Sequence, residues 1–432
     1  MKKVAVLHSS HLVEWQSCQT IGNNLLSAYQ MMAEDKNFDV KFCKISNKNE
    51  LLENVRISEK LLEWGVDRIV WIEYSPTPLN FLNILESHFV GNSNRPELVI
   101  HVYGDFVLNI ADWNSMQDLL AKYSVKFIAA SEKQGVLVSK LLQKGSSLVE
   151  VCPFPVNCDQ FRFDGKKREL FRQKYHFENN ELVILYSGRL SYQKNIFHLL
   201  YIVKDFVKLT SSDVRLVLAG PIDDLGMPYI GLSGPLGAFF GQFKMVRKNV
   251  RELFDTGKVQ ILGNVDQEEL RGLYCASDLL VNLSTHNDED YGMAPAEALC
   301  SGLPALLSAW GGFCSFKSLF SKFVFSIPLV IEMGRFLPSY KKGLKELMSF
   351  SALSKEQRLE LSELARSKIG IESIAQQLKK VETEKFEGFS QDFVKVLAAF
   401  SSVNKGPFKG PRGQLSQLYF NIYSDYGEMN NE

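Results

Sequence analysis

The sequence lacks the features of several protein classes. Its 432 residues include only seven cysteines, without a C-x-x-C pair, which is not the pattern of a disulfide-rich secreted domain. No stretch approaches the roughly 20 apolar residues of a membrane span, and MKKVAVLHSSHLVEW is too polar for a signal peptide. Basic and acidic residues balance at 49 each, so no net charge attracts nucleic acid. We therefore expect a cytoplasmic protein with reduced cysteines.

Two nucleotide-binding motifs are also missing. After the first expected strand the chain reads HSSHLV, where a dinucleotide-dependent oxidoreductase needs Gly-x-Gly-x-x-Gly. The glycines at 231–237 follow no strand and open no helix, so they do not replace that motif. No G-x-x-x-x-G-K-[ST] occurs either, which argues against a Walker-type hydrolase.

The chain is long enough for two domains, and its pattern repeats an alternation. Short β-rich runs alternate with amphipathic segments in the first half, and a second such series follows the proline-containing stretch CPFPVNCDQF. This alternation predicts parallel sheets covered by helices on both faces, an α/β fold with two doubly wound lobes. We expect Rossmann-like lobes at 1–155 and 156–384 and a C-terminal extension at 385–432, of which Phe389–Phe400 packs back on the first lobe.

A candidate anion site lies in EDYGMAPAEALCSG, residues 289–302. A buried strand and a polar loop precede it, and Pro295 suits the first turn of a helix. The amides of Gly292, Met293 and Ala294 would then be donors at the positive end of that helix. Anions bind at such helix ends.

Two carboxylates, Glu289 and Glu297, flank this anion site. Carboxylates accept hydrogen bonds from vicinal hydroxyls, so the pair suits a ligand that carries both phosphate and sugar. Alternatively, the negative charge of Glu297 only stabilises the N-terminus of the helix, and Glu289 is a solvated loop residue without a ligand.

The stretch LVILYSGRLSYQKN adds two cations to the candidate site. A strand ends in a tight turn at Gly188, and Arg189 and Lys194 follow at the mouth of a helix. Arginine and lysine are the usual side chains for phosphate oxygens, and the two could hold a diphosphate without a metal. The alternative is a pair of ordinary surface cations.

Taken in order, GRLSYQKN, LVLAGP, VQILGNVDQEELRGLYCASDLLVNLS and EDYGMAPAEALCSGLPALLSAWGG resemble the retaining family 4 glycosyltransferases. The resemblance runs from about residue 150 to residue 315. It implies the GT-B fold, in which two Rossmann-like lobes face a central cleft. It implies a retaining hexosyltransferase that uses a nucleoside-diphosphate sugar, needs no metal, and has a glycan or glycolipid acceptor.

The resemblance also implies the role of each residue. Arg189 and Lys194 would bind the donor diphosphate, Glu297 the ribose hydroxyls and Glu289 the transferred sugar. The other donor-binding residues that it implies are Gly188 in the turn, Gly292, Met293 and Ala294 with their amides, and Gly263 and Asn264 in the loop for the base.

The first lobe resembles the family mainly in its alternation. Ser9 and Ser10 stand where relatives carry a glycine-rich turn, and Tyr103 in VIHVYGDF occupies the position of a frequent histidine. We expect Tyr103 to donate a hydrogen bond to the sugar and Asp105 to lie in the cleft, with His101 as a core residue. These differences leave open a sugar-nucleotide-binding protein that has lost transfer activity.

Residues 225–257 form a longer and more aromatic connection than relatives have. The simpler interpretation is a loop with a packed phenylalanine cluster. The alternative is a contact with the acceptor or with a membrane surface, which would place the protein at the inner face of the membrane.

Overall fold

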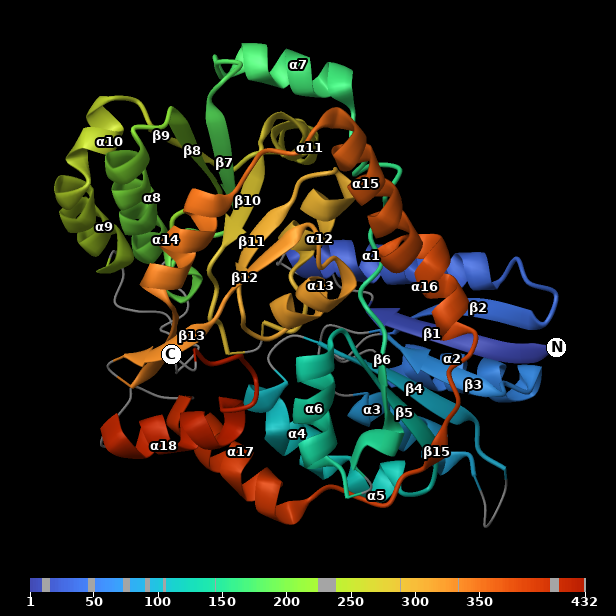
Figure 1. Cartoon of the computed structure of the whole chain (residues 1–432). Helices are drawn as coiled ribbons and strands as arrows, with labels where there is room; N and C mark the ends of the chain where they lie inside the picture. Colours follow the sequence, from blue (N-terminus) through green and yellow to red (C-terminus); the bar gives the residue numbers. More distant parts are fainter. Residues whose placement is uncertain are drawn as a thin grey trace. The chain divides into compact units, whose positions relative to one another are not determined.

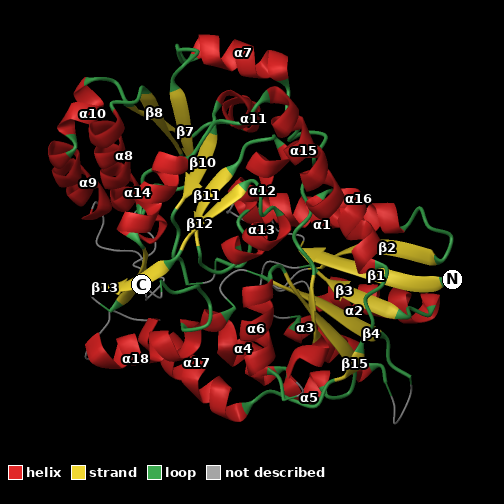
Figure 2. Ribbon diagram, in the orientation of Figure 1, coloured by secondary structure: helices red, strands yellow, loops and turns green. Residues whose placement is uncertain are grey.

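The computed structural model describes residues 1–9, 16–45, 51–72, 78–89, 94–103, 106–143, 145–223, 238–287, 289–332, 334–404 and 412–430. The chain divides into two compact units, residues 1–155 with 369–409 and residues 156–368 with 410–432. Each unit contains a mainly parallel sheet with helices on its faces (Figure 1, Figure 2). The α/β fold expected from the alternating pattern is confirmed.

The first unit is built on a sheet of strand order β15-β5-β4-β3-β1-β2, and β6 also pairs with β5. Strand β1, next to the edge strand β2, pairs in parallel with β2 and β3, whereas β15 is antiparallel to β5. The elements are β1 (Lys2–Ser9), α1 (Gln16–Met32), β2 (Phe38–Ile45), α2 (Leu51–Trp64), β3 (Arg68–Trp71), α3 (Leu79–Ser87), β4 (Glu97–Val102), η1 (Val107–Asn109), α4 (Ile110–Ser115), α5 (Gln117–Leu120), β5 (Ser124–Ala129), α6 (Glu132–Leu141), η2 (Gly145–Leu148), β6 (Val149–Val151), α16 (Ile371–Leu378), β15 (Glu384–Lys385) and α17 (Gln391–Asn404).

The second unit has a six-stranded parallel sheet of order β12-β11-β10-β7-β8-β9. The strand order reverses between the neighbours β7 and β10, and ligands of doubly wound sheets bind at the carboxyl ends of strands at such a switch point. The elements are α7 (Gly165–Lys174), β7 (Leu182–Ser187), η3 (Tyr192–Lys194), α8 (Ile196–Thr210), β8 (Val214–Ala219), α9 (Ala238–Asn249), α10 (Arg251–Asp255), β9 (Val259–Gly263), α11 (Gln267–Ala276), β10 (Leu279–Asn282), α12 (Met293–Cys300), β11 (Ala305–Ser308), α13 (Phe313–Leu319), β12 (Val324–Ile327), β13 (Leu329–Glu332), β14 (Arg335–Pro338), α14 (Tyr340–Ser349), α15 (Lys355–Ile369) and α18 (Arg412–Tyr423).

Helices cover both faces of the second sheet. Figure 1 shows α8, α9 and α14 on one face and α11, α12 and α13 on the other. The aromatic segment expected as a loop contains the helices α9 and α10, and Phe239 of α9 stacks on Phe197 of α8 with ring centroids 4.9 Å apart. The phenylalanine cluster thus forms part of the core. Residues 224–237, with the glycines at 231–237, lie outside the described residues.

The last part of the chain is shared between the two units. Residues 369–384, which the sequence analysis assigned to the second lobe, belong to the first unit, because the apolar side of α16 packs against α1. Helix α17 follows in the same unit, where Ser401 Oγ donates a hydrogen bond of 2.7 Å to the Leu108 carbonyl. Residues 412–430 return to the second unit. The expected extension is therefore two segments with different packing partners.

The described residues also bear on membrane spans and cysteines. No helix among them combines the length and the apolar character that crossing a membrane requires. All seven cysteines lie in the described part and are free thiols.

Candidate functional site

The loops after β7 and β10 meet through a buried ion pair at the carboxyl edge of the second sheet. Lys194 ends η3, and its Nζ lies 2.6 Å from Glu289 Oε2 and 3.2 Å from Ser284 Oγ. The two loops leave neighbouring strands at the switch point of the sheet. The structure thus brings together a cation and an acid that the sequence analysis assigned to one site.

The Lys194–Glu289 pair is largely shielded from solvent. The two side chains are only 15% and 12% exposed. Burial alone would raise the pKa of Glu289, but attraction to Lys194 and hydrogen bonds from Lys194 and Ser284 outweigh it, so the pKa lies below its ordinary value. The neighbouring His286 stays neutral, because burial and the Lys194 charge lower its pKa to about 3.

Arg189 is held at the same edge of the sheet. Its Nη1 lies 3.1 Å from Asp223 Oδ2 on the loop after β8. The two loops touch backbone to backbone, because a Cβ at Gly220 would lie 1.9 Å from the Gly188 carbonyl oxygen. Gly188 itself has φ +139°, a conformation that side chains other than glycine rarely adopt. The turn therefore fixes the backbone from which the Arg189 side chain extends.

The N-terminus of α12 supplies backbone donors near the Glu289 loop. Gly292 is its N-cap, with φ +106°, and a Cβ there would lie 2.5 Å from the Phe313 ring. The first bond of the helix runs from Ala296 N to Gly292 O, so the amides of Met293 and Ala294 precede it. Binding of an anion by these amides stays a prediction.

Glu297 lies deeper than the sequence suggested. The residue is 8% exposed, and the Tyr274 hydroxyl of α11 donates a 3.2 Å hydrogen bond to its Oε2. Burial raises the pKa of Glu297 to about 7. The two acids of the motif therefore differ, since Glu289 is ionised by its lysine and Glu297 titrates near neutrality.

The raised pKa of Glu297 makes stability depend on pH. The folded protein holds a proton that the unfolded chain, with a glutamate pKa of about 4.3, releases at lower pH. The stabilising effect of the neutral carboxyl is complete below that value and is lost as pH rises through about 7. Glu297→Gln should therefore stabilise the protein relative to wild type more at pH 8 than at pH 5. The difference in unfolding free energy should be up to about 3 kcal/mol, with a correspondingly larger gain in Tm at pH 8. Calorimetry that gives the same difference at both pH values would contradict this prediction.

A support behind the Glu289 loop escaped the sequence analysis. Gly312 N donates to the Glu289 carbonyl at 2.7 Å, and the Tyr426 hydroxyl reaches the same oxygen at 3.2 Å. A Cβ at Gly311 would lie 2.3 Å from that oxygen, and one at Gly312 only 2.4 Å from Tyr291 Cα. The loop rests on two glycines and the C-terminal segment. The Gly-Gly pair of AWGG was the only feature of the sequence that could have indicated this support.

The remaining residues of the second lobe lie in the β9–α11 turn. Gly263 ends β9 with φ +68°, and its carbonyl accepts a 2.7 Å bond from Gly220 N. Asn264 follows and is exposed. Their assignment to the base of a nucleotide stays a prediction.

The predicted residues of the first lobe belong to the first unit. Tyr103 is 5% exposed and donates to the Ile72 carbonyl at 2.8 Å, so the structure shows its hydroxyl used within the core and not offered to a sugar. His101 is a core residue as expected, with Nε2 2.9 Å from the Tyr29 hydroxyl. Ser9 ends β1. Ser10 and Asp105 lie outside the described residues.

We compared the chain with a family model, with a curated protein and with solved structures. Residues 167–326 match the model for glycosyl transferases group 1. The uncharacterized glycosyltransferase MJ1607 of Methanocaldococcus jannaschii is 30% identical over 201 residues, which are 46% of this chain and 46% of that protein. A glycosyltransferase from Rickettsia africae has a TM-score of 0.59 at 16% identity over 92% of this chain and 98% of its own. Anabaena Alr3699/HepE, in complex with UDP and glucose, has a TM-score of 0.56 at 16% identity. The likeness covers 88% of this chain and 99% of that chain.

These comparisons support a fold for most of the chain and a family match for part of it. Its two doubly wound units have the GT-B fold of glycosyltransferases, which the structural likeness supports over most of the chain. Within that class, residues 167–326 match the model for the glycosyl transferases group 1 family, which is less than half of the chain. The matched segment contains Arg189, Lys194, Glu289 and Glu297. The chain spans less than half the length of the curated relative that it matches.

Proposed function

We propose that this protein transfers a hexose-type sugar from a nucleoside-diphosphate sugar to a hydroxyl group of a glycan or glycolipid, with retention at the anomeric carbon. The observation that carries the proposal is the buried Lys194–Glu289 pair at the switch point of a glycosyl transferases group 1 domain. In this proposal Lys194 contacts the donor diphosphate, and Glu289 contacts the transferred sugar. The first unit takes the acceptor.

Charge development explains the choice of residues. When the bond from the anomeric carbon to the diphosphate breaks, negative charge grows on the leaving phosphate. Arg189 and Lys194 are already held by Asp223 and Glu289, so little reorganisation is needed to stabilise that charge. The Met293 and Ala294 amides add to this effect. The acceptor hydroxyl attacks the same face and passes its proton to the departing phosphate, so neither a protein nucleophile nor a metal takes part.

The nucleotide can be identified by its effect on thermal stability. UDP, GDP, ADP and their glucose conjugates are compared in a thermal-shift assay, because a ligand at 100 times its Kd stabilises by about 2.7 kcal/mol. We expect one base to be preferred, and UDP is tested first because the Anabaena structure holds UDP and glucose. No shift with any nucleotide would contradict the proposal.

Glu289→Ala tests the contact with the sugar. We expect transfer to fall by roughly 100-fold, because an interaction that orients the reacting sugar is lost. Affinity for the nucleoside diphosphate without sugar should stay within a few-fold. Glu363→Ala, an exposed glutamate on α15, is the control and should change neither quantity. An equal loss of nucleotide affinity in Glu289→Ala would refute the assignment.

A further inference from the structure

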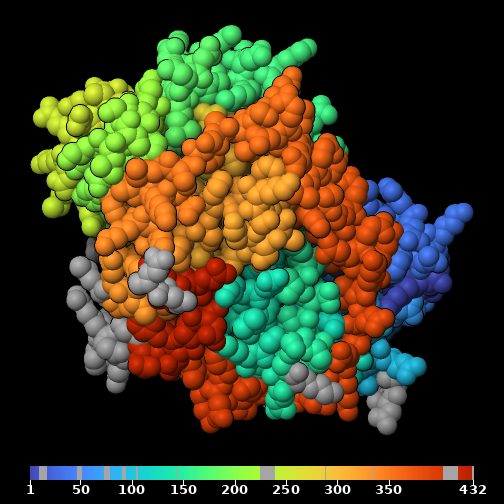
Figure 3. Space-filling model, viewed as in Figure 1, coloured from blue at the N-terminus to red at the C-terminus, as the bar shows by residue number. Residues whose placement is uncertain are grey.

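A pocket lies on the edge of the second sheet opposite to Lys194 and Glu289. Its volume is about 810 Å³, and residues 163–179, around α7, and residues 353–358, at the start of α15, line it. This edge carries the amino ends of β7 and β10, whereas the site described above follows their carboxyl ends. Figure 3 shows the two lining segments, in green and orange, side by side at the surface. We name it the Asp278 pocket after the carboxylate that its arginines contact.

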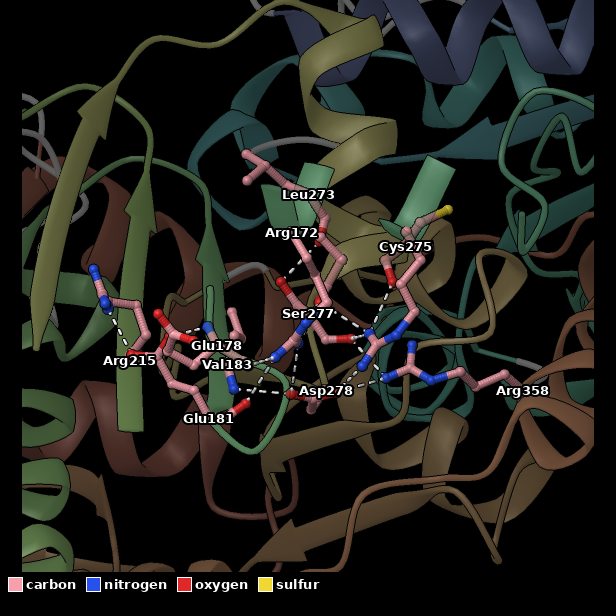
Figure 4. Close-up of polar contacts among 12 residues, drawn as sticks. Arg172, Glu178, Glu181, Val183, Arg215, Leu273, Cys275, Ser277, Asp278 and Arg358 are labelled. Atoms are coloured by element: carbon pink, nitrogen blue, oxygen red, sulfur yellow. Dashed lines mark hydrogen bonds and ion pairs between the residues drawn. The ribbon is translucent and has the colours of Figure 1, made fainter. Parts of the chain in front are cut away.

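Three arginines that line the pocket converge on Asp278 (Figure 4). Arg168 Nη2 lies 2.7 Å, Arg358 Nη2 3.1 Å and Arg172 Nη1 3.3 Å from its carboxylate oxygens. The nearby Glu181 is paired with Arg215 at 2.8 Å. Three guanidinium groups thus share one carboxylate, and the cluster keeps an excess of positive charge.

Arg358 is the most deeply buried of the three and is not fully satisfied. The residue is 1% exposed, and its Nε and Nη1 have no hydrogen-bond partner among the described residues. Burial and repulsion from Arg168 lower the pKa of Arg358 to about 10, which still leaves it charged. Unpaired buried donors are rare in proteins, and they mark a place where a partner is missing.

Two lysines extend the positive charge to the mouth of the pocket. Lys166 and Lys355 are exposed, and Lys355 Nζ lies 4.0 Å from the position that a Cβ at Gly165 would occupy, over the N-terminus of α7. Asp164 already caps that helix by accepting from Lys166 N at 2.9 Å. In all, five lysines or arginines and three aspartates or glutamates line the pocket.

We propose that the Asp278 pocket binds a small soluble molecule that carries a phosphate group, held by Lys166, Lys355 and Arg358. The volume falls within the roughly 300 to 1,000 Å³ of small-ligand sites, and Phe163 and Phe177 provide an apolar wall for the rest of the ligand. Phosphate matches the guanidinium donors and balances the excess charge. The arginines also join α7 to β10, but that structural role needs neither lysine.

Calorimetric titration with inorganic phosphate tests the proposal. It is done at constant ionic strength with the whole protein, in the presence of the nucleoside diphosphate that the thermal-shift assay selects, or of UDP if none is selected. Lys166→Ala with Lys355→Ala should weaken phosphate binding by about tenfold or more, since charge-assisted hydrogen bonds are lost. The control is Lys341→Ala with Lys345→Ala, which removes two exposed lysines of α14 and should leave binding within about twofold. Arg358 is left intact because its loss could unfold the domain.

Three results would overturn the proposal. They are no phosphate binding by the wild type, an equal loss in the control, and phosphate binding that occurs only when the nucleotide is left out, which would place the phosphate in the donor site. Flotation with phosphatidic acid vesicles adds a fourth outcome. If the protein floats with the vesicles and this binding needs both lysines, the pocket would be assigned to a lipid headgroup instead of a soluble ligand. Since the readout is phosphate binding, failure here leaves the proposed transfer activity untouched.

Discussion

Replacing Arg189 and Lys194 together by alanine should remove measurable binding of the nucleoside diphosphate. Hydrogen bonds from charged groups contribute about 1.5 to 3 kcal/mol each, so losing both cations should raise Kd by roughly 100-fold to 10,000-fold. Isothermal titration with the preferred nucleotide measures the loss. Arg247→Ala with Lys248→Ala removes two exposed cations of α9 and is the control. Unchanged affinity in the Arg189 and Lys194 variant would remove the basis of the proposed donor site.

The buried pair requires one more control. Removal of Lys194 leaves the Glu289 carboxylate, 12% exposed, without its cation, so a loss of binding could follow from local unfolding. Lys194→Ala with Glu289→Ala removes both charges and should recover most of the lost stability. Nucleotide binding should remain weak in that variant, because the phosphate contact is still absent. Recovery of binding along with stability would show that Lys194 acts only through Glu289.

Asp278→Asn should destabilise the second unit severely. The asparagine keeps the shape and an oxygen acceptor for Val183 N, which donates to Asp278 at 2.9 Å. It removes the one negative charge among three arginines, and breaking such a buried pair typically costs about 3 to 5 kcal/mol. For a unit of this size, Tm should fall by on the order of 10 °C, as measured by calorimetry or circular dichroism.

An exposed ion pair provides the matched control. Asp255 and Arg251 lie 2.7 Å apart on α10 with side chains 58% and 79% exposed, so the same change, Asp255→Asn, should cost less than about 0.5 kcal/mol. Equal losses in the two variants would mean that the charge of Asp278 is not the cause. If Asp278→Asn had no effect, the arginine cluster would not hold the unit together.

Much of the fold follows from local patterns. A run such as LVILYSGRLSYQKN contains a strand, a glycine turn and the start of a helix, and each depends on residues close in the chain. Once β7 and β10 are taken as parallel strands, their loops are expected at one edge of a sheet. The sequence could therefore place Lys194 and Glu289 in one site, and the structure brings them into contact.

The partners of these residues could not be predicted in the same way. Asp223 beside Arg189, Tyr274 beside Glu297 and Tyr426 behind Glu289 come from separate elements, and none forms a local motif with its partner. Tyr103 shows the reverse case. Its position after β4 suggested a ligand contact, but packing against Phe154 and a bond to Ile72 place it in the core.

By itself the sequence determined the order of strands, turns and helices in the two lobes, and with it the edge of the second sheet at which the charged residues stand. Such patterns are local, because they depend on hydrophobic periodicity and on glycine and proline at turns. Only the tertiary structure decided that Glu289 is ionised by Lys194, that Glu297 titrates near neutrality, and that three arginines share Asp278. Burial and the distances between distant segments set these charges, and both arise only when the chain is folded.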